Sequence, residues 1–566
     1  MIRIGNASGF HGDRFSAWRE MLDGGELDVL TGDYLAELTM LILGRDRLRD
    51  PDLGYARTFL RQAESCLGAA LERGVRLVTN AGGLNPAGLA AALESLCAKL
   101  GLTARIGYVE GDALPRPDAL TANAYLGAFG IAACLADGAD IVVTGRVTDA
   151  SLVVGPAIAH FGWGRDDLDA LAGATVAGHL IECGAQVTGG NFSFFTELPD
   201  GGRRPGFPIA ELYADGSAVI TKHPGTGGAV TVETVTAQLL YEIDTPYYLG
   251  PDVVTRLDTV ALAPDGPDRV RLRGTRGLPP PATLKLGVNN LGGFRNSMTF
   301  VLCGLEIEAK AALVRAQIED AVGPVGLEFV LARTDHPDSS VTETASALLH
   351  VHLRDGDKAR AGRAFSAAAV ELALASYPGC TLTTLPGDAT PYGVFTADSV
   401  PQPAVPHVAV LPSGERVTIP PPQECWEGPL PIPDPISGGL SQHFSRRRGP
   451  LGELVGARSG DKGGDANLGV WARTDPAYAW LRGWLTVDRL RELLPETAGL
   501  PVERYDLPNL RAVNFVIRGL LGQGVAASTR FDPQAKALGE LLRARIVDLP
   551  AVLAPGDATD GTGTGG

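Results

Sequence analysis

The chain has 566 residues, of which 45% are hydrophobic and 20% charged, and its formal net charge is −16. This length and composition predict several globular domains with ample cores. An acidic surface repels phosphate backbones, so we expect no nucleic-acid partner. No run reaches the ~20 apolar residues that cross a bilayer, and we expect no membrane partner either.

The seven cysteines are scattered and form no Cys-x-x-Cys pair. A disulfide framework or a zinc knuckle would need closer spacing, so we interpret them as reduced thiols and assign no metal site. The chain opens on a strand-like run, without the charged and apolar regions of a signal peptide. We therefore expect a cytoplasmic protein. The cysteines are Cys66, Cys97, Cys134, Cys183, Cys303, Cys380 and Cys425.

Over the first third of the chain, short β-branched runs alternate with longer helical stretches. This alternation is typical of an α/β fold, a parallel sheet with helices on its faces. Ligands bind such sheets at the carboxyl ends of the strands, so we expect the loops that follow these runs to converge. The runs are Ile2–Ile4, Val75–Thr79, Ala104–Val109 and Ile141–Thr144, and the helical stretches include Phe59–Leu71 and Pro86–Leu100.

From about residue 192 to about residue 330, strand-like pieces are broken by glycine and proline, which predicts a second, β-rich lobe. Beyond them, a helix over Glu306–Ile318, a strand over Ser346–His352 and a helix over Arg363–Ala375 are expected. The strand-like pieces of the lobe are Ala218–Lys222, Ala229–Val235, Arg269–Arg273 and Thr283–Gly287.

Prolines crowd the chain between Pro378 and Pro450, which is typical of a linker. The segment beyond it pairs strand-like runs with helical stretches, the last of them Pro533–Arg543, and this fits a small ferredoxin-like α+β domain. We therefore predict an α/β domain over 1–445, a ferredoxin-like domain over 446–552, and a disordered tail over 553–566 that is rich in Gly, Thr and Asp.

Several spaced motifs, matching in order, resemble the acyclic terpene utilisation (AtuA) family. They are Ile4–Arg14, Asn80–Pro86, Val143–Ala150 and Glu182–Asn191. The stretch Arg458–Asn467 is similar to the signature of the family's ferredoxin-fold domain, with one more glycine at Gly463-Gly464 than the family pattern. The resemblance implies a large AtuA domain fused to a ferredoxin-fold domain, in the context of acyl-CoA catabolism. It carries over no catalytic residue set.

The first glycine-rich loop, Gly5–Arg14, can leave backbone N–H groups free for a phosphate or carboxylate. Its spacing fits neither a dinucleotide fold nor a P-loop. His11 and Asp13 are candidate catalytic groups because both titrate, and Gly9 and Arg14 are candidate anion-binding residues. The alternative is a tight strand-to-helix connection with hydrogen bonds at the helix start.

The next loop follows the run that ends at Thr79. Asn80 is a candidate catalytic donor to a substrate carbonyl, and Gly82 and Gly83 are candidate substrate-binding positions. The alternative is a helix start, because Asn85 is a natural N-cap and Pro86 suits the first helical position.

The third loop contains our preferred anion site, formed by Gly145, Arg146 and Asp149. The preceding run is fully apolar, so Arg146 emerges at its carboxyl end, where a guanidinium can clamp a carboxylate or pyrophosphate. The alternative is an internal ion pair between Arg146 and Asp149 that holds the turn.

Other polar residues follow the remaining runs. Glu110 is a candidate catalytic base, and Asp112 and Asp33 could join it or bind a metal, although acids at loop ends are usually solvated or capping. Glu182 and Cys183 border another glycine-rich turn, but no base for a cysteine nucleophile is identifiable.

Two loops in later parts of the chain are also polar. His223 could act as an acid or base, or belong to a hairpin turn built from proline and glycine. Lys462 could bind an anion, or its loop, Ser459–Asp465, could dock one domain on another.

We interpret the chain as an enzyme that acts on a branched or terpenoid-derived acyl-CoA, by carbon–carbon lysis or hydrolysis of a 3-hydroxyacyl-CoA. The acyl-CoA would be a substrate rather than a bound cofactor, no cofactor is assigned, and a homo-oligomer is expected. The alternative is a non-catalytic binding or scaffold partner of an acyl-CoA carboxylase.

Overall fold

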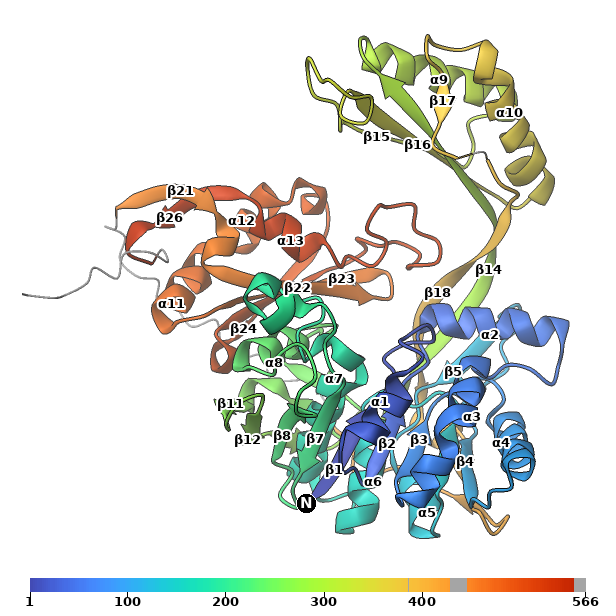
Figure 1. Ribbon diagram of the computed structural model, residues 1–566, viewed down its shortest axis with the longest axis vertical. Coiled ribbons are helices and arrows are strands. Elements are labelled where there is room, and N and C mark those ends of the chain that lie inside the picture. Colours follow the sequence, from blue (N-terminus) through green and yellow to red (C-terminus); the bar gives the residue numbers. More distant parts are fainter. Residues whose placement is uncertain (385, 428–444, 554–566) are drawn as a thin grey trace, which may run out of the picture. The chain divides into compact units, whose positions relative to one another are not determined.

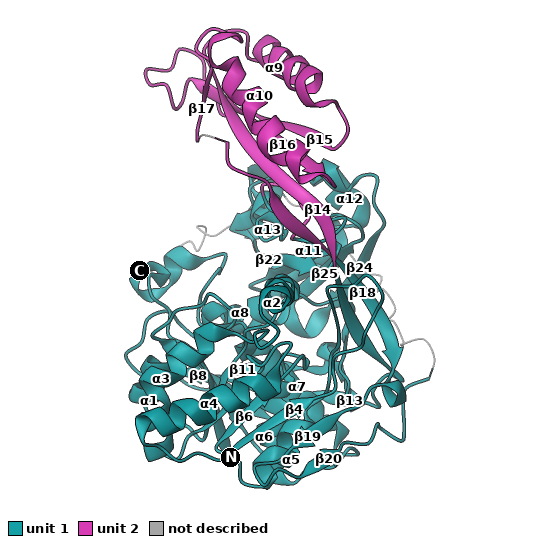
Figure 2. Cartoon of the chain, turned by 90° about the vertical axis from the view of Figure 1, so that its right-hand side faces the viewer, with its two compact units in different colours: residues 1–289, 395–525, 532–566 teal, residues 290–394, 526–531 magenta. Residues whose placement is uncertain are grey.

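The structure is a computed structural model that describes residues 1–384, 386–427 and 445–553. It divides into two compact units, coloured separately in Figure 2. Unit 1 comprises residues 1–289, 395–525 and 532–566, and unit 2 comprises residues 290–394 and 526–531. The prolines between 428 and 444 of the expected linker, and residues 554–566 of the expected tail, lie outside the described residues.

The centre of unit 1 is the parallel sheet that the sequence predicts (Figure 1). Its five central strands pair in parallel in the order β1-β2-β3-β6-β4. Four of them match predicted runs to within two residues at each end, whereas β2 was not predicted. The strands are β1 (Ile2–Asn6), β2 (Val29–Gly32), β3 (Arg76–Thr79), β6 (Ile141–Thr144) and β4 (Ile106–Glu110).

Helices cover both faces of this sheet, and strand side chains alternate between two cores. Val78 and Val142 belong to one core, whereas Leu77 and Val143 belong to the other. The first face carries α5 (Phe129–Ala136), α6 (Ser151–Phe161) and α7 (Leu168–Glu182); the second carries α1 (Ala17–Gly24), α3 (Arg57–Glu72) and α4 (Pro86–Leu100). The fold class predicted from the sequence is therefore confirmed.

Antiparallel strands extend both edges of the sheet, so that eleven strands of the described residues belong to it. The stretch after residue 192 is rich in strands, as predicted, and part of it joins the main sheet, because its first strand pairs with the free edge of β1. The added strands are β7 (Pro208–Leu212), β8 (Ala218–Lys222), β12 (Val270–Arg273) and β11 (Ala261–Pro264) on one edge, and β19 (Val408–Val410) and β20 (Arg416–Thr418) on the other.

One predicted strand is a helix. The run Ala229–Val235, rich in β-branched residues, gives way to α8 (Val232–Leu239). The reason is a capping box: the Thr231 hydroxyl accepts from the amide of Thr234 at 3.2 Å, and the Thr234 hydroxyl accepts from the amide of Thr231 at 2.9 Å. This local capping satisfies helix-start amides and outweighs β propensity.

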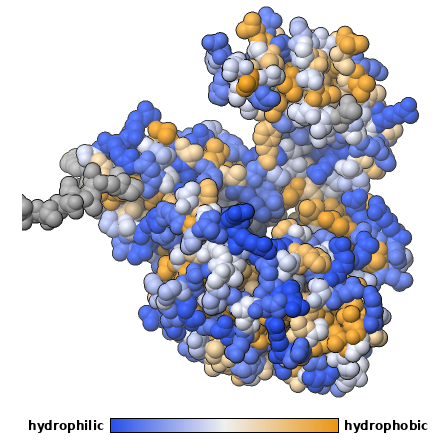
Figure 3. Space-filling view, viewed as in Figure 1, coloured by the Kyte–Doolittle hydropathy of each residue, from blue (hydrophilic) through white to orange (hydrophobic). Residues whose placement is uncertain are grey.

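Smaller elements complete this part of unit 1. They are α2 (Glu37–Arg49), β5 (Thr121–Ala124), which pairs with the start of β14 (Thr283–Cys303), and a sheet of β9 (Tyr247–Leu249), β10 (Val254–Arg256) and β13 (Arg276–Leu278). The visible face in Figure 3 is largely hydrophilic, with separate hydrophobic patches. No helix in the described ranges has the length and apolar character that crossing a membrane requires.

Unit 2 is an antiparallel sheet with two helices on one face. Strands β15 (Leu327–Ala332), β16 (Ser346–Asp355), the later part of β14 and β17 (Thr381–Leu382) pair in this order. Helices α9 (Ile307–Val322) and α10 (Phe365–Glu371) bury its apolar side chains. β18 (Thr390–Pro401) pairs with β14 and leads back to unit 1.

The C-terminal domain lies within unit 1 and has the ferredoxin-like α+β character that the sequence predicts. The segment Arg458–Asp465, predicted as a loop, is almost entirely strand, and only Gly463-Gly464 form the hairpin turn. The strands of its sheet have the order β22 (Val455–Lys462), β23 (Asp465–Ala472), β25 (Ala512–Ile517), β24 (Val502–Leu507). Its helices are α11 (Asp475–Trp484), α12 (Val487–Leu493) and α13 (Leu538–Arg543). A separate two-stranded sheet pairs β21 (Arg446–Pro450) with β26 (Ile546–Pro550).

Candidate functional site

The loops after β1, β2 and β3 meet at the carboxyl edge of the parallel strands. Asn80 is fully buried; its Nδ2 donates to Asp33 Oδ1 at 2.6 Å, and its Oδ1 accepts from the amide of Tyr34 at 2.8 Å. Ser8 Oγ donates to the carbonyl of Asp33 at 3.0 Å. The convergence predicted for parallel strands therefore places Asp33 at the meeting point of three loops.

Arg146, after β6, reaches the same place. Its Nη1 donates to the carbonyl of Leu35 at 3.0 Å and to Asp149 Oδ1 at 2.9 Å, and its guanidinium lies 4.1 Å from the ring centre of Tyr125. The side chain is 5% exposed, and its buried Nε has no hydrogen-bond partner among the described residues. The internal pair with Asp149 thus exists, yet this arginine keeps a free donor.

A small pocket opens beside Arg146. It has a volume of about 10 Å³, enough for about one water, and its lining includes Glu37, Tyr125 and Asn123. Lys285 Nζ lies 3.6 Å from Glu37 Oε1 and 4.7 Å from the Tyr125 ring centre. Burial opposes ionisation of Glu37, but the charges of Lys285 and Arg146 outweigh it and lower the pKa of this carboxyl. Glu37 therefore stays a carboxylate.

The last turn of α7 contributes a histidine–carboxyl pair. His179 Nδ1 and Glu182 Oε1 are 3.1 Å apart, and both side chains are buried. Burial lowers the pKa of His179 to about 4. Burial, with the charges of Asp149 and Glu242, raises the pKa of Glu182 well above its usual value. Both pKa shifts favour the neutral form of each group, and in that form the Glu182 hydroxyl donates to Nδ1.

This protonation pattern fixes the free end of the imidazole. With Nδ1 accepting from Glu182, the ring proton lies on Nε2. His179 Nε2 and Glu182 Oε2 are both buried without a hydrogen-bond partner in the described chain. Unpartnered buried polar atoms are rare in folded proteins and mark places where a water or a ligand group completes the pairing.

Cys183 follows this pair and is not suited to act as a nucleophile. Burial, together with the charges of Glu182 and Glu242, raises the pKa of its thiol well above the usual value, so the thiolate is scarce. A side chain at Gly9 would meet the Cys183 backbone at 2.6 Å, and Asn6 Nδ2 donates to the carbonyl of Ile181 at 2.6 Å. Gly9 thus lets the first loop pack on the end of α7.

The C-terminal domain also reaches this region. Lys462, near the end of β22, donates from Nζ to the carbonyl of Glu242 at 3.0 Å. Its charge contributes to the pKa shifts of Glu37, His179 and Glu182. The groups from α2, α7 and β22 therefore lie within electrostatic range of one another and form one cluster.

Acidic groups outnumber cations in this charged cluster. Burial raises the pKa of Asp33, and the nearby charge of Asp149 raises it further. Because there are too few cations to balance every carboxylate, some carboxyls stay protonated while Glu37 stays ionised. Proton donors and a carboxylate thus coexist, as acid–base chemistry requires. The cluster consists of Asp33, Glu37, Arg146, Asp149, His179, Glu182, Glu242, Lys285 and Lys462.

The other candidates from the first loop lie around its own turn. Asp13 accepts from the amides of Gly9 at 2.8 Å and Arg14 at 2.7 Å, which closes the loop. Arg14 donates to the carbonyl of Pro205 at 3.0 Å and pairs with Glu20 at 3.0 Å. His11 is half-buried, and burial lowers its pKa. None of these contacts is with the charged cluster.

Of the two acids that flank Gly111, it is Asp112 that lies at the cluster. Glu110 pairs with Arg416 on β20. Asp112 is buried, and its Oδ2 accepts from Asn123 Nδ2 at 2.7 Å and from the amide of Arg146 at 3.0 Å. Burial raises the pKa of Asp112 to about 6.

Three of the predicted glycines allow close packing near the cluster. A side chain at Gly82 would meet the carbonyl of Thr144 at 2.5 Å, and Gly83 has a left-handed backbone with φ +54°. A side chain at Gly145 would collide with the carboxyl of Asp112. The helix start predicted as the alternative for this loop is also present, because Asn85 Oδ1 accepts from the amide of Gly88 at 2.9 Å.

His223 is a packing residue. It is buried, and its Nε2 lies 2.9 Å from the carbonyl of Met21. Within the described ranges, no three His, Cys, Asp or Glu side chains are grouped so that they could hold a metal ion.

Several members of the cluster were not singled out in the sequence. Glu182 was noted only as bordering a glycine-rich turn, and His179 was not noted. The two are three residues apart on one helix, a spacing that places them on one face, and this signal could have identified the pair. Glu37, Lys285 and Glu242 have no local signal, since each becomes a neighbour of the others only through the tertiary fold.

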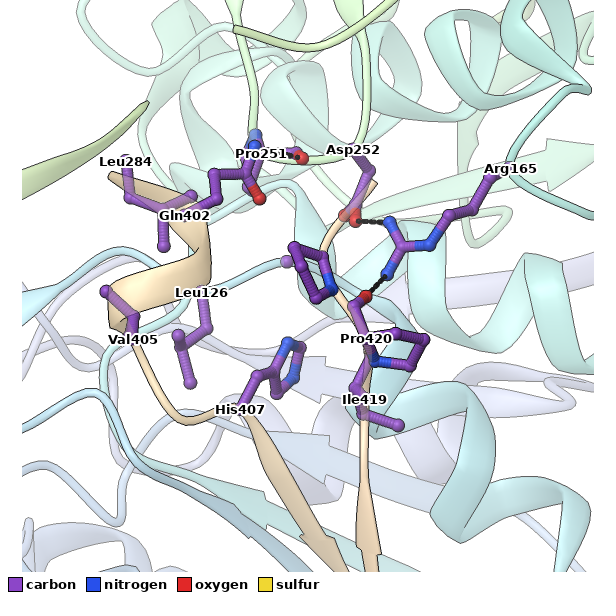
Figure 4. Close-up of a pocket in the computed structure, with 12 residues that line it drawn as sticks. Leu126, Arg165, Pro251, Asp252, Leu284, Gln402, Val405, His407, Ile419 and Pro420 are labelled. Carbon is purple, nitrogen blue, oxygen red and sulfur yellow. Dashed lines mark hydrogen bonds and ion pairs between the residues drawn. The ribbon is translucent and has the colours of Figure 1, made fainter. Parts of the chain in front are cut away.

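A second pocket lies away from these groups, between the segment after β20 and the start of α5 (Figure 4). Its volume is about 20 Å³. Arg165 donates to the carbonyl of Pro420 at 2.7 Å and lies 3.7 Å from Asp252, whose Oδ2 accepts from the amide of Ala128 at 2.7 Å. These contacts tie backbone segments together, so we interpret this pocket as structural.

Two family models match the sequence. The model of the acyclic terpene utilisation family protein AtuA matches residues 2–411, and that of the AtuA ferredoxin-like domain matches residues 449–548. A search of curated proteins gave no match.

Proposed function

Because the chain belongs to the acyclic terpene utilisation family AtuA, we propose that it is an enzyme that acts on a branched or terpenoid-derived acyl-CoA. Family membership implies a role in acyclic terpene utilisation. The observation that carries the catalytic part of the proposal is the charged cluster, in which Arg146 Nε, His179 Nε2 and Glu182 Oε2 are buried without partners among the described residues. Such atoms are costly in a purely structural site.

The cations of the cluster suit a thioester substrate. Arg146, Lys285 and Lys462 come from separate elements, and each lies near carboxylates that hold it in place. Positive groups fixed in a poorly solvated site stabilise negative charge that develops on a carbonyl oxygen. A thioester whose carbonyl becomes an enolate therefore matches this arrangement.

We assign the reaction to carbon–carbon lysis of a 3-hydroxyacyl-CoA. The Asp149 carboxylate takes the proton of the 3-hydroxyl group, whose oxygen then forms a carbonyl as the C2–C3 bond breaks. The electron pair of that bond moves to the thioester as an enolate, which Arg146 stabilises. A proton added at C2 gives the shorter acyl-CoA, so that one proton moves from oxygen to carbon overall.

His179 has a catalytic role in this scheme, and Glu182 positions it. Its Nε2 proton, held by the interaction of Nδ1 with Glu182, donates a hydrogen bond to the thioester oxygen. A neutral imidazole can polarise a carbonyl in this way without carrying a full charge.

Two other functions are separated from lysis by their products. Hydrolysis of the same thioester would release free coenzyme A and a 3-hydroxy acid. A scaffold partner of an acyl-CoA carboxylase would give no product alone, but would change carboxylase turnover when added to it. Lysis instead yields an aldehyde or ketone together with a shorter acyl-CoA.

The test is to incubate the purified full-length protein with branched 3-hydroxyacyl-CoA thioesters and to identify products by mass spectrometry. We expect a carbonyl fragment and a shortened acyl-CoA from the wild-type protein. Replacement of Arg146 by lysine keeps a cation but removes the planar contact with Tyr125, and should lower kcat about 100-fold. Wild-type protein that changes no thioester, alone or with a carboxylase, would refute the proposal.

A further inference from the structure

Glu242 has an unusual backbone. It lies three residues after α8, and its φ of +55° is in the left-handed region. A side chain makes this conformation unfavourable, so residues other than glycine, asparagine and aspartate adopt it mainly where the surrounding structure holds them. Strained residues of this kind gather at functional sites, and Glu242 belongs to the charged cluster.

The C-terminal domain holds this residue at both of its backbone polar groups. Asn467 Oδ1 on β23 accepts from the amide of Glu242 at 2.8 Å, and Lys462 Nζ on β22 donates to its carbonyl at 3.0 Å. Asn467 is fully buried, and its Nδ2 also donates to the carbonyl of Leu240 at 2.9 Å. The turn is therefore fixed by side chains from another domain.

The surface of that domain is shaped for this turn. A side chain at Gly469 would meet Leu240 Cβ at 2.6 Å, and one at Gly460 would collide with the Tyr241 ring. Asn514 Nδ2 on β25 donates to the carbonyl of Asp244 at 2.7 Å. Three neighbouring strands thus contact the turn in succession, and glycines let it approach the sheet.

The Glu242 side chain acts on the groups assigned to the reaction. Its charge contributes to the pKa shifts of His179, Glu182 and Cys183. Burial raises the pKa of the Glu242 carboxyl itself, and the charges of Glu37 and Asp149 oppose its ionisation further. As a whole residue Glu242 is partly exposed, whereas Glu182 is buried.

We propose that Glu242 is the acid that delivers a proton to C2 of the substrate, and that Asn467 and Lys462 of the C-terminal domain are the positioning residues that hold it there. This inference rests on the proposed lysis. The proton leaves the Glu242 carboxyl as C2 gains it, and the proton that Asp149 took from the hydroxyl group returns to Glu242 before the next turnover. The ferredoxin-like domain is then part of the catalytic site.

The first test compares Glu242→Gln, Glu242→Ala and Glu242→Gly in the full-length protein. All three lack an acid and should lower kcat about 100-fold or more with little change in KM. Glycine adopts the left-handed backbone without steric cost, so Glu242→Gly should melt about 1–3 °C above Glu242→Ala. Equal kcat for wild type and Glu242→Gln would overturn the assignment of the acid.

The second test concerns positioning. Asn467→Ala removes the acceptor for the Glu242 amide, and we expect a kcat loss of about tenfold with a shifted alkaline limb of the pH–rate profile. Arg473→Ala is the matched control: it breaks contacts with Glu197 and Glu233 across the same domain boundary without touching Glu242. Asn467→Ala with the same profile as this control would contradict a positioning role.

These outcomes separate the two proposals. Wild-type protein that cleaves no thioester refutes the lysis and, with it, the acid role of Glu242. Active wild-type protein with an active Glu242→Gln variant refutes only the acid role. Comparison of Glu242→Gly with Glu242→Ala needs no substrate. If the melting temperature of Glu242→Ala equalled or exceeded that of Glu242→Gly, the strained backbone held by the C-terminal domain would be refuted.

Discussion

Two arginine–aspartate pairs in unit 1, each with one buried partner, serve different purposes. Arg165 and Asp252 lie at the pocket of Figure 4, where both are tied to backbone groups of neighbouring segments. Arg146 and Asp149 lie at the carboxyl edge of the sheet, among carboxyls that lack enough cations. The charges of the first pair balance and hold segments together, whereas the carboxyls around the second pair outnumber the cations, and we place the proposed chemistry there.

Substitution of both arginines tests whether the two pairs differ in function, and the largest effect is expected at Arg146. Arg146→Lys should lower turnover of the thioester about 100-fold, because a donor aimed at developing charge is displaced. Arg165→Lys should leave kcat within about threefold and lower only the melting temperature. Steady-state kinetics and thermal unfolding of both variants measure this, and equal kcat losses would remove the distinction between the two pairs.

The buried histidines extend the comparison. His179→Gln removes the donor aimed into the charged cluster, and we expect a kcat about 100-fold lower, within the range for a lost catalytic contact. His407 lines the Figure 4 pocket, and burial lowers its pKa to about 4, as it does for His179. His407→Gln should therefore leave kcat nearly unchanged. Steady-state kinetics measure both variants, and a larger kcat loss in His407→Gln than in His179→Gln would contradict a catalytic contact by His179.

The pH dependence of stability gives a third comparison. Burial raises the pKa of Asp112 from 3.8 to about 6 in the folded protein. The folded state then binds this proton more tightly than the unfolded chain does. Protonated Asp112 therefore contributes fully to the free energy of unfolding below pH 3.8, and this contribution is lost as the pH rises through about 6. The loss amounts to roughly 3 kcal/mol.

Asp112→Asn should remove this part of the pH dependence. Denaturant unfolding at pH 4.5 and pH 7.5 should show a smaller difference in the variant than in the wild type. Glu110→Gln is the matched control, because Glu110 is the other acid beside Gly111 and pairs with Arg416. If the free energy of unfolding of Asp112→Asn changed with pH as much as that of the wild type, a raised pKa of the buried Asp112 carboxyl would be contradicted.

The smallest expected effect belongs to the pair of Glu110 and Arg416. The Arg416 side chain is 56% exposed, and exposed ion pairs contribute about 0–1 kcal/mol. Arg416→Ala should therefore leave both the free energy of unfolding and kcat nearly unchanged. Unfolding in denaturant and steady-state kinetics measure both, and a large loss of activity would return Glu110 to the reaction.

Much of the fold followed from local patterns. The run Ile141–Thr144 and the helix Pro86–Leu100 have the same bounds in the sequence prediction and in the structure, because β-branched runs and capped helix starts are local signals. β2 was not predicted because its residues, Val29–Gly32, include only two apolar side chains and end in glycine, whereas the equally short β6 is fully β-branched. The hairpin of β22 and β23 was predicted with a longer loop than it has, Arg458–Asp465, because this part of its strands contains glycine and charged residues.

The candidate site was only partly accessible in this way. Asn80, Arg146 and Asp149 were identified because each follows a predicted strand, and parallel strands direct such loops to one edge. Lys285 lies in a strand far along the chain, and nothing near it in sequence indicates that it approaches Glu37. His179 was not identified because apolar residues dominate the sequence of its helix, α7.

The sequence by itself determined the family, the fold class and the edge of the sheet at which polar loops gather, because each depends on motifs and periodicity within short segments. Only the tertiary structure decided which carboxyls are protonated and which domain holds Glu242. The physical reason is that a pKa depends on burial and on charges from distant parts of the chain, and a left-handed backbone persists only where separate strands hold it.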